Sequence, residues 1–115
     1  MALSPALLIA STQLANAVAS VGGPLTPAHW LIQRAVFTNV DTAARTITVH
    51  RVPAAGTPAA ANEVIGAFVL NAVGQSGHTY TAPELAGMVL NPGDTLQAFA
   101  DVAAKVNITV SGFTY

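Results

Sequence analysis

The 115 residues are enough for one domain with its own hydrophobic core. Apolar residues make up 52% and charged residues only 8%, against roughly 25% charged residues in an average soluble domain. The absence of cysteine excludes disulfides, four Lys and Arg residues are too few for direct binding to nucleic acid, and no apolar run approaches the ~20 residues of a membrane span.

Residues 1–12 form an apolar stretch that we predict as an N-terminal arm, ahead of a single β-sandwich domain over residues 13–115. The stretch is only superficially similar to a secretory signal peptide, because no Lys or Arg precedes Arg34 and Pro5 interrupts the apolar run. Leu7–Val21 is instead predicted to form a first strand or a pair of strands.

A loop rich in Gly and Pro, residues 22–27, precedes a second predicted strand over residues 28–39. The apolar residues of this strand fall on both parities, with Trp30 and Ile32 on one and Phe37 on the other. Either a β-bulge shifts the register or both faces of the strand make apolar contacts, and we favour contacts on both faces.

The next predicted strand, residues 45–52, alternates regularly, with Ile47 and Val49 directed inward and His50 directed to solvent. A short turn separates it from the preceding strand, and two consecutive strands joined in this way predict an antiparallel hairpin. A long loop of Ala, Pro and Gly follows over residues 53–61.

Residues 62–71 make a continuous apolar run that predicts a strand. A helix is the competing interpretation, because Val64 and Phe68 are spaced as on one helical face. Residues 78–82 predict a short strand, and residues 84–90 predict either one helical turn or a strand.

The last third of the chain carries the clearest strand pattern. Val106, Ile108 and Val110 fall on one parity and polar residues on the other, so this strand is expected to bury one face. The turn at residues 91–94, in which Asp94 can bond to nearby backbone, leads into the strand before it. Together the two strands predict a closing hairpin.

These segments add up to seven to nine short strands, with turn signals about every 8–12 residues and no long helix. A parallel α/β fold would need long helices between its strands. The sequence therefore predicts an all-β fold, an antiparallel β-sandwich of jelly-roll-like form.

No residue pattern indicates catalysis, a cofactor or a metal site. His29, His50 and His78 have no second ligand at a recognised metal-binding spacing. Asp94 and Asp101 flank one predicted strand, which gives no basis for a catalytic pair of carboxylates. We therefore expect a protein that is not an enzyme and that binds no cofactor.

The scarcity of charge indicates the setting in which the chain works. A formal net charge of −1 favours association, so we expect a multi-subunit assembly that includes a homo-oligomer. The alternative is a small sandwich whose surface is Thr, Asn, Gln and Ala. The residues expected at an interface are Leu7, Leu8, Ile9, Trp30, Phe37, Phe113 and Tyr115. The aromatic residues leave a sugar-binding platform open as a further alternative.

Several segments resemble a type of small virion protein of tailed bacteriophages and prophages. They are FTN at 37–39, ARTITV at 44–49, VPAAGT at 52–57 with AN at 61–62, PELAGMVL at 83–90, NPGDTLQAFAD at 91–101 and the closing strand over 106–112. The resemblance extends from about Gln13 to Phe113, and the apolar stretch Leu3–Ala10 departs from it.

The resemblance implies a β-sandwich or jelly-roll module that is a structural part of a virion. Its most direct implication is a capsid decoration or cement protein with the major capsid protein as partner, and the alternative is a tail or fibre module that binds a host receptor or glycan. A cement protein stabilises the assembled shell because it binds that state and not the free precursor.

Overall fold

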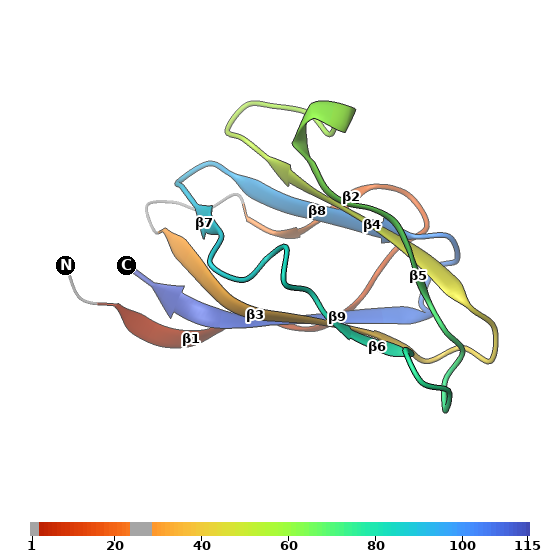
Figure 1. The fold of residues 1–115 in the computed structure, drawn as a ribbon. Coiled ribbons are helices and arrows are strands. Elements are labelled where there is room, and N and C mark those ends of the chain that lie inside the picture. The colour runs from red at the N-terminus through yellow and green to blue at the C-terminus, as the bar shows by residue number, and fades with distance from the viewer. Residues whose placement is uncertain (1–2, 24–28) are drawn as a thin grey trace.

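The computed structural model describes residues 3–23 and 29–115, which form nine antiparallel strands in two facing sheets (Figure 1). The strands are β1 (Ser4–Gln13), β2 (Ala19–Gly22), β3 (Trp30–Asn39), β4 (Arg45–Val52), β5 (Glu63–Leu70), β6 (Thr79–Thr81), β7 (Val89–Leu90), β8 (Thr95–Ala100) and β9 (Val106–Thr114), with a short 3-10 turn, η1 (Ala60–Asn62), before β5. The predicted all-β sandwich is confirmed. Residues 1–2 of the predicted arm, residues 24–27 of the predicted loop and residue 28 of the predicted strand lie outside the described residues.

The strand order follows from nested pairing along the chain. Sheet A has the order β1-β9-β3-β6, with β7 also paired to β3, and sheet B has the order β2-β8-β4-β5. The pairs are therefore β1 with β9, β2 with β8, β3 with β6 and β7, and β4 with β5. Strands near the two ends of the chain pair with each other, and the pairs closer to the middle of the chain lie inside them. Taken in this order, the pairs fall alternately in sheet A and sheet B, as in a double-sheet jelly roll.

Both predicted hairpins are wrong. β3 lies in sheet A and β4 in sheet B, and likewise β8 lies in sheet B and β9 in sheet A. Among the described strands, only β4 and β5 are both consecutive in the chain and paired. A short polar loop can close a hairpin or cross between facing sheets, so the alternation that locates a strand does not identify its partner.

The mixed parity of β3 arises from a β-bulge. The register of β3 against β9 shifts between Ile32 and Arg34. Because of this shift, Ile32 before the bulge and Phe37 after it both point into the core, and both are 0% exposed. The β-bulge therefore explains why apolar residues of β3 fall on both parities. For Ile32 and Phe37, which lie on the same face, the favoured prediction of apolar contacts on both faces is not required.

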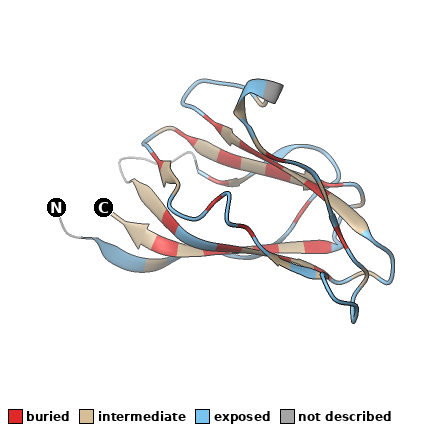
Figure 2. Cartoon of the chain, in the orientation of Figure 1, coloured by how far each residue is buried: buried red, intermediate tan, exposed pale blue. Residues whose placement is uncertain are grey.

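The inward side of β9 is formed as predicted. Val106, Ile108 and Val110 are all 0% exposed and belong to the core between the sheets (Figure 2). On the facing sheet, Ile47 and Val49 of β4 are also fully buried in this core. Apolar burial between the two inner faces is thus the main attraction that holds the sheets together.

The predicted exposure of His50 is wrong. Its side chain is only 9% exposed, although it was predicted to reach solvent. The turn η1 at the end of the long 53–62 connection packs against β4, and Val52, two residues further along β4, is buried as well. Strand alternation alone does not show that the connection following a strand folds back over it.

The structure decides between the interpretations of residues 62–71 and 84–90. The apolar run Glu63–Leu70 is strand β5 and not a helix. Residues 83–87 form turns, and the strand interpretation of the following residues holds only for the two residues of β7.

Most of the predicted arm is an edge strand of the sandwich. Ser4–Gln13 forms β1, which pairs with β9 along sheet A, so the boundary predicted between residues 12 and 13 falls within this strand. Figure 1 shows β1 beside β9, where Ser4 at the start of β1 pairs with Thr114 at the end of β9.

One open side of the sandwich is closed by an aromatic pair. Phe68 of β5 in sheet B and Tyr80 of β6 in sheet A stack with ring centroids 4.0 Å apart. The Tyr80 hydroxyl donates to Glu84 Oε1 at 2.6 Å, and burial together with this hydrogen bond raises the pKa of Tyr80 to about 12.

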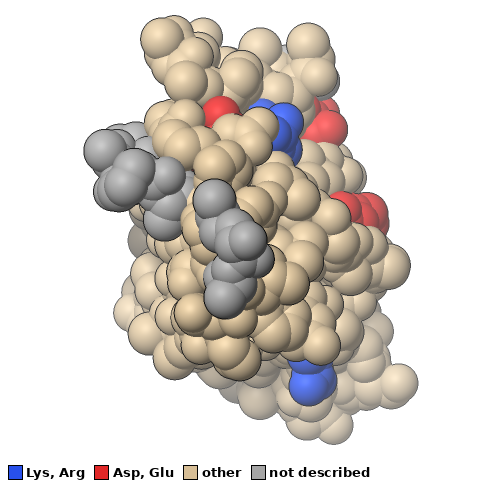
Figure 3. Space-filling view, turned by 90° about the vertical axis from the view of Figure 1, so that its left-hand side faces the viewer, with Lys and Arg blue, Asp and Glu red and all other residues tan. Residues whose placement is uncertain are grey.

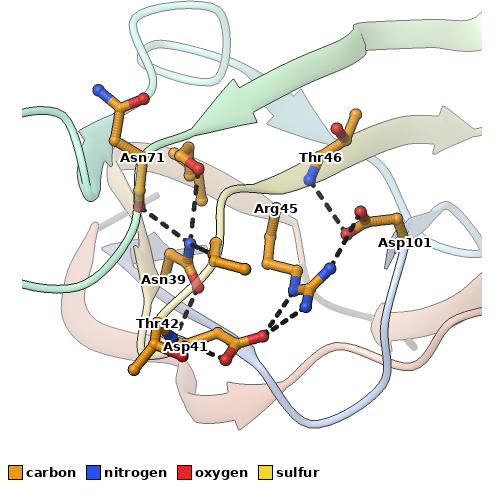
Figure 4. Close-up of polar contacts among 9 residues, drawn as sticks. Asn39, Asp41, Thr42, Arg45, Thr46, Asn71 and Asp101 are labelled. Atoms are coloured by element: carbon orange, nitrogen blue, oxygen red, sulfur yellow. Dashed lines mark hydrogen bonds and ion pairs between the residues drawn. The ribbon is translucent and has the colours of Figure 1, made fainter.

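A buried amide organises the crossing from β3 to β4 (Figure 4). Asn39 is 0% exposed, and its Nδ2 donates to the backbone oxygens of Ala43 and Asn71, both at 2.9 Å. Its Oδ1 accepts from the backbone nitrogen of Asp41 at 2.9 Å. The side chain therefore satisfies three backbone groups, two in the connection from β3 to β4 and one just after β5.

An arginine joins this crossing to the one between β8 and β9. Arg45 donates to Asp41 Oδ2 from Nε at 2.7 Å and from Nη2 at 2.6 Å, and its Nη1 lies 3.5 Å from Asp101 Oδ2 (Figure 4). Asp101 also accepts from the backbone nitrogen of Thr46 at 3.1 Å. The hydrogen bond from the Arg45 guanidinium lowers the pKa of Asp41.

The predicted role of Asp94 in its turn is confirmed at the opposite end of the sandwich. Its carboxylate accepts from the backbone nitrogens of Asn91 at 3.0 Å and Ala54 at 3.1 Å, and from Arg51 Nη2 at 2.8 Å. Arg51 also donates from Nε to the backbone oxygen of Val89 at 3.2 Å, which links sheet B to sheet A.

The close approach of β9 to the bulge of β3 predicts that Gly112→Ala destabilises the fold. A Cβ at position 112 would overlap the backbone oxygen of Leu31 and lie 2.9 Å from the nitrogen of Gln33. We expect a loss of about 1–3 kcal/mol in the free energy of unfolding, measured by urea denaturation. The matched control is Gly66→Ala, whose Cβ would meet only the flexible carboxylate of Glu63 and should change stability by less than about 0.5 kcal/mol. Equal losses in both variants would contradict this account.

The Asp41–Arg45 pair predicts an acid-dependent contribution to stability. The pKa of Asp41 is lowered from 3.8. The stabilisation of the folded state by its carboxylate is therefore fully present above pH 3.8 and is lost as the pH falls through the lowered pKa. Wild type should therefore be more stable than Asp41→Asn at neutral pH, with a difference that shrinks below pH ~4 and in high salt. Urea denaturation across this pH range measures the difference, and a constant difference down to the acid limit would rule the explanation out.

Candidate interaction surface

Side chains on the outer side of sheet A form an apolar row across four strands, which we call the Phe113 row. Pro5, Phe113, Leu31 and Val89 occupy successive partner positions on β1, β9, β3 and β7. Leu31 alternates with the fully buried Ile32, so the row points away from the core. Phe113, Leu31 and Val89 are half-buried and are not among the residues that pack against the core.

An aromatic pair extends this row towards the end of the sheet. The rings of His29 and Tyr115 stack with centroids 4.9 Å apart and an interplanar angle of 12°. Their backbones exchange two hydrogen bonds, of 2.9 Å and 3.2 Å. Because strand side chains repeat every two residues, this pair lies on the same face as Leu31 and Phe113.

Leu7 extends the row on the other side. It follows Pro5 by two residues on β1, pairs with Ser111 of β9 and is 61% exposed. The Phe113 row together with Leu7, His29 and Tyr115 is the sheet A patch. Aromatic and aliphatic side chains of this kind are enriched at the centres of protein interfaces.

The sheet A patch contains three of the seven predicted interface residues: Leu7, Phe113 and Tyr115. Leu8 and Trp30 are half-buried and pack against the core. Ile9 and Phe37 belong to the core, at 4% and 0% exposed, so their prediction as interface residues is wrong. Ile9 pairs with Val110 and Phe37 with Ile108, and the alternation that buries the β9 residues also directs their partners inward.

Sequence reasoning missed Leu31 and Val89, and it did not assign Pro5 to a contact. The polar parity of β9 runs through Asn107, Thr109 and Ser111, and its continuation places Phe113 outward. That signal is present in the sequence. The neighbours of Phe113 are known only from strand pairing, which the sequence does not reveal.

Sheet A carries a single formally charged residue. The strands β1, β3, β6, β7 and β9 contain Arg34 and no Lys, Asp or Glu. Arg34 is exposed, pairs in register with Ser111, and forms no ion pair within the part of the chain that the structure describes.

Elsewhere, arginines and aspartates neutralise one another. Arg45 pairs with Asp41 and Asp101, and Arg51 pairs with Asp94. On the side of the molecule that Figure 3 shows, a few charged groups stand among mostly uncharged atoms, and some of opposite sign lie next to each other.

Over residues 3–23 and 29–115 the surface has no pocket, and no three His, Asp or Glu side chains gather where they could hold a metal ion. Nor does this part of the chain contain a helix with the length and hydrophobicity of a membrane span. Comparisons with protein-family models, curated proteins and solved structures find no match for the chain. The sheet A patch is therefore the feature from which a function is derived.

The division between patch and core predicts different costs for two apolar substitutions. Leu7→Ser removes a side chain that is 61% exposed and should change the free energy of unfolding by less than about 0.5 kcal/mol. Phe37→Ala creates a cavity at a residue that is 0% exposed and should cost about 3–5 kcal/mol. Urea denaturation of both variants tests the assignment, and a large loss for Leu7→Ser would place that residue in the core.

Proposed function

We propose that this chain is a non-enzymatic structural protein of a bacteriophage particle, and that it decorates or cements the assembled capsid through contacts with the major capsid protein. The observation that carries the proposal is the sheet A patch, an apolar and aromatic surface on the outer face of a sandwich. The resemblance of several segments to small virion proteins supports the same role.

The chemistry of the patch suits a contact between folded proteins. Burying apolar surface contributes roughly 25 cal/mol per Å², and a standard interface covers about 800 Å² on each partner. With a single formally charged residue on the strands of sheet A, covering this face desolvates few ions. Low charge then favours stable contact over free solution.

A cement protein acts by selective binding. We propose that it contacts two neighbouring subunits of a lattice at once, and the patch offers side chains from four strands for these contacts. If those subunits lie next to each other only in the mature shell, binding stabilises that shell by mass action. We place the protein on the capsid surface, and we propose self-association into a homo-oligomer through other parts of the molecule.

The stacked pair His29–Tyr115 favours a second candidate function, a tail or fibre module that binds a host receptor or glycan. Both aromatic rings lie on an open sheet face, where their π-faces can meet the apolar face of a sugar ring. A glycan array separates the two functions. Specific signal that disappears in Tyr115→Ala supports glycan binding, and an empty array removes it.

The leading proposal predicts binding to particles. Capsids prepared from a phage or prophage that lacks this chain should recover it on mixing, with saturation at a stoichiometry set by the lattice and a Kd below about 1 μM. Sedimentation of particles with added protein measures this, and bound capsids should release their DNA at a higher temperature than bare capsids. Protein that stays in the supernatant at every concentration would contradict the proposal.

A further inference from the structure

In the part of the chain that the structure describes, the two sheets have four edges, and three of them are unsuited to pairing with another chain. β2 is only four residues long, and one edge of sheet A is divided between β6 and β7, which have three and two residues. β5 is bent by a register shift opposite Ile47–Val49, where Ala67 has a φ of 48°. Short or bulged edges disfavour the addition of a strand.

The fourth edge, β1, is ten residues long and uncharged, but a proline interrupts it. His29 and Tyr115 form a hydrogen-bonded pair, so Leu31 and Phe113, two residues further on, form the next one. The backbone nitrogen and oxygen of Phe113 therefore point to β3. The backbone nitrogen and oxygen of its other partner, Pro5, point to the free edge of sheet A. Proline has no N–H to donate there, and two register shifts bend the rest of β1.

Contact through side chains is therefore favoured over strand addition. The sheet A patch lies on a continuous part of the sheet, where β1, β9, β3 and β7 are hydrogen-bonded neighbours. A face of this kind packs against another apolar surface at about 10 Å, as sheets pack in a sandwich.

The charge on the outer face of sheet A indicates whether a second copy of this chain or a different protein covers it. Arg34 is the only formally charged residue in the strands of sheet A. Two copies packed through this face would cover two guanidinium groups and no carboxylate from the strands of sheet A. A covered cation without a partner is costly, whereas an Arg–carboxylate hydrogen bond is among the stronger polar contacts.

We propose that the sheet A patch is covered, face to face, by a different protein whose contacting surface is apolar at its centre and carries a carboxylate opposite Arg34. This inference rests on the proposed function in taking that protein from the same particle.

The test measures binding of four variants to capsids that lack this chain. Phe113→Ser removes the centre of the patch, Arg34→Glu reverses the charge, and Arg34→Lys keeps it. Val69→Ser is the matched control, because Val69 is 56% exposed on β5 of sheet B. We expect Phe113→Ser and Arg34→Glu to weaken binding about tenfold or more, Arg34→Lys to weaken it less than Arg34→Glu, and Val69→Ser to match wild type.

Two further measurements separate a contact from a folding defect. All variants should unfold as single cooperative transitions, and wild-type affinity should fall with added NaCl more steeply than that of Arg34→Glu. The sedimentation coefficient of the free protein should be the same for wild type and Phe113→Ser, because the patch does not bind a second copy.

The outcomes distinguish this inference from the proposed function. Wild-type binding with all variants bound equally overturns the inference and leaves the proposed function in place. A change in the self-association of free protein in Phe113→Ser assigns the patch to a second copy and also overturns it. Failure of wild type to bind any capsid overturns the proposed function and the inference that rests on it.

Discussion

Hydrogen bonding along both edges of β9 is the constraint on which the rest of the structure depends. Because β9 pairs with β1 on one side and β3 on the other, its backbone is fixed in the middle of sheet A. Alternation then sends Val106, Ile108 and Val110 into the core and Phe113 to the outside. One strand thereby contributes three residues to the core and presents the aromatic centre of the exterior patch.

The neighbours of β9 convert that single aromatic residue into a surface. The bulge in β3 changes parity after Ile32, which lets Leu31 stay outward while Phe37 is buried. Pro5 and Val89 complete the row from the flanking strands. The ion pairs of Arg45 and Arg51 lie at the crossings between the sheets, where their charges are neutralised. Arg34 is left as the one formal charge on the strands of sheet A.

Local patterns in the sequence located most of the strands, and in one case both ends of a strand: the predicted strand 45–52 coincides with β4. The two residues of β7 lie in a segment that the sequence left open between a helical turn and a strand. Strand partners were beyond the sequence, because a short loop can join strands within a sheet or across two sheets. The same limit explains the errors at Ile9 and Phe37, which were assigned to an arm and a strand end but are directed inward by their β9 partners. Leu7, Phe113 and Tyr115 were placed on an exposed surface from residue type and position, whereas Leu31 and Val89 join them only through pairing.

The central claim is that the outer face of sheet A is the face by which this protein is held in a larger assembly. Cryo-electron microscopy of intact particles that contain the chain tests it most directly. The account predicts density in which Leu31 and Phe113 are buried against a neighbouring virion protein, with a carboxylate of that neighbour beside Arg34. Density in which this face points to solvent, while another side of the sandwich makes the contact, would contradict it.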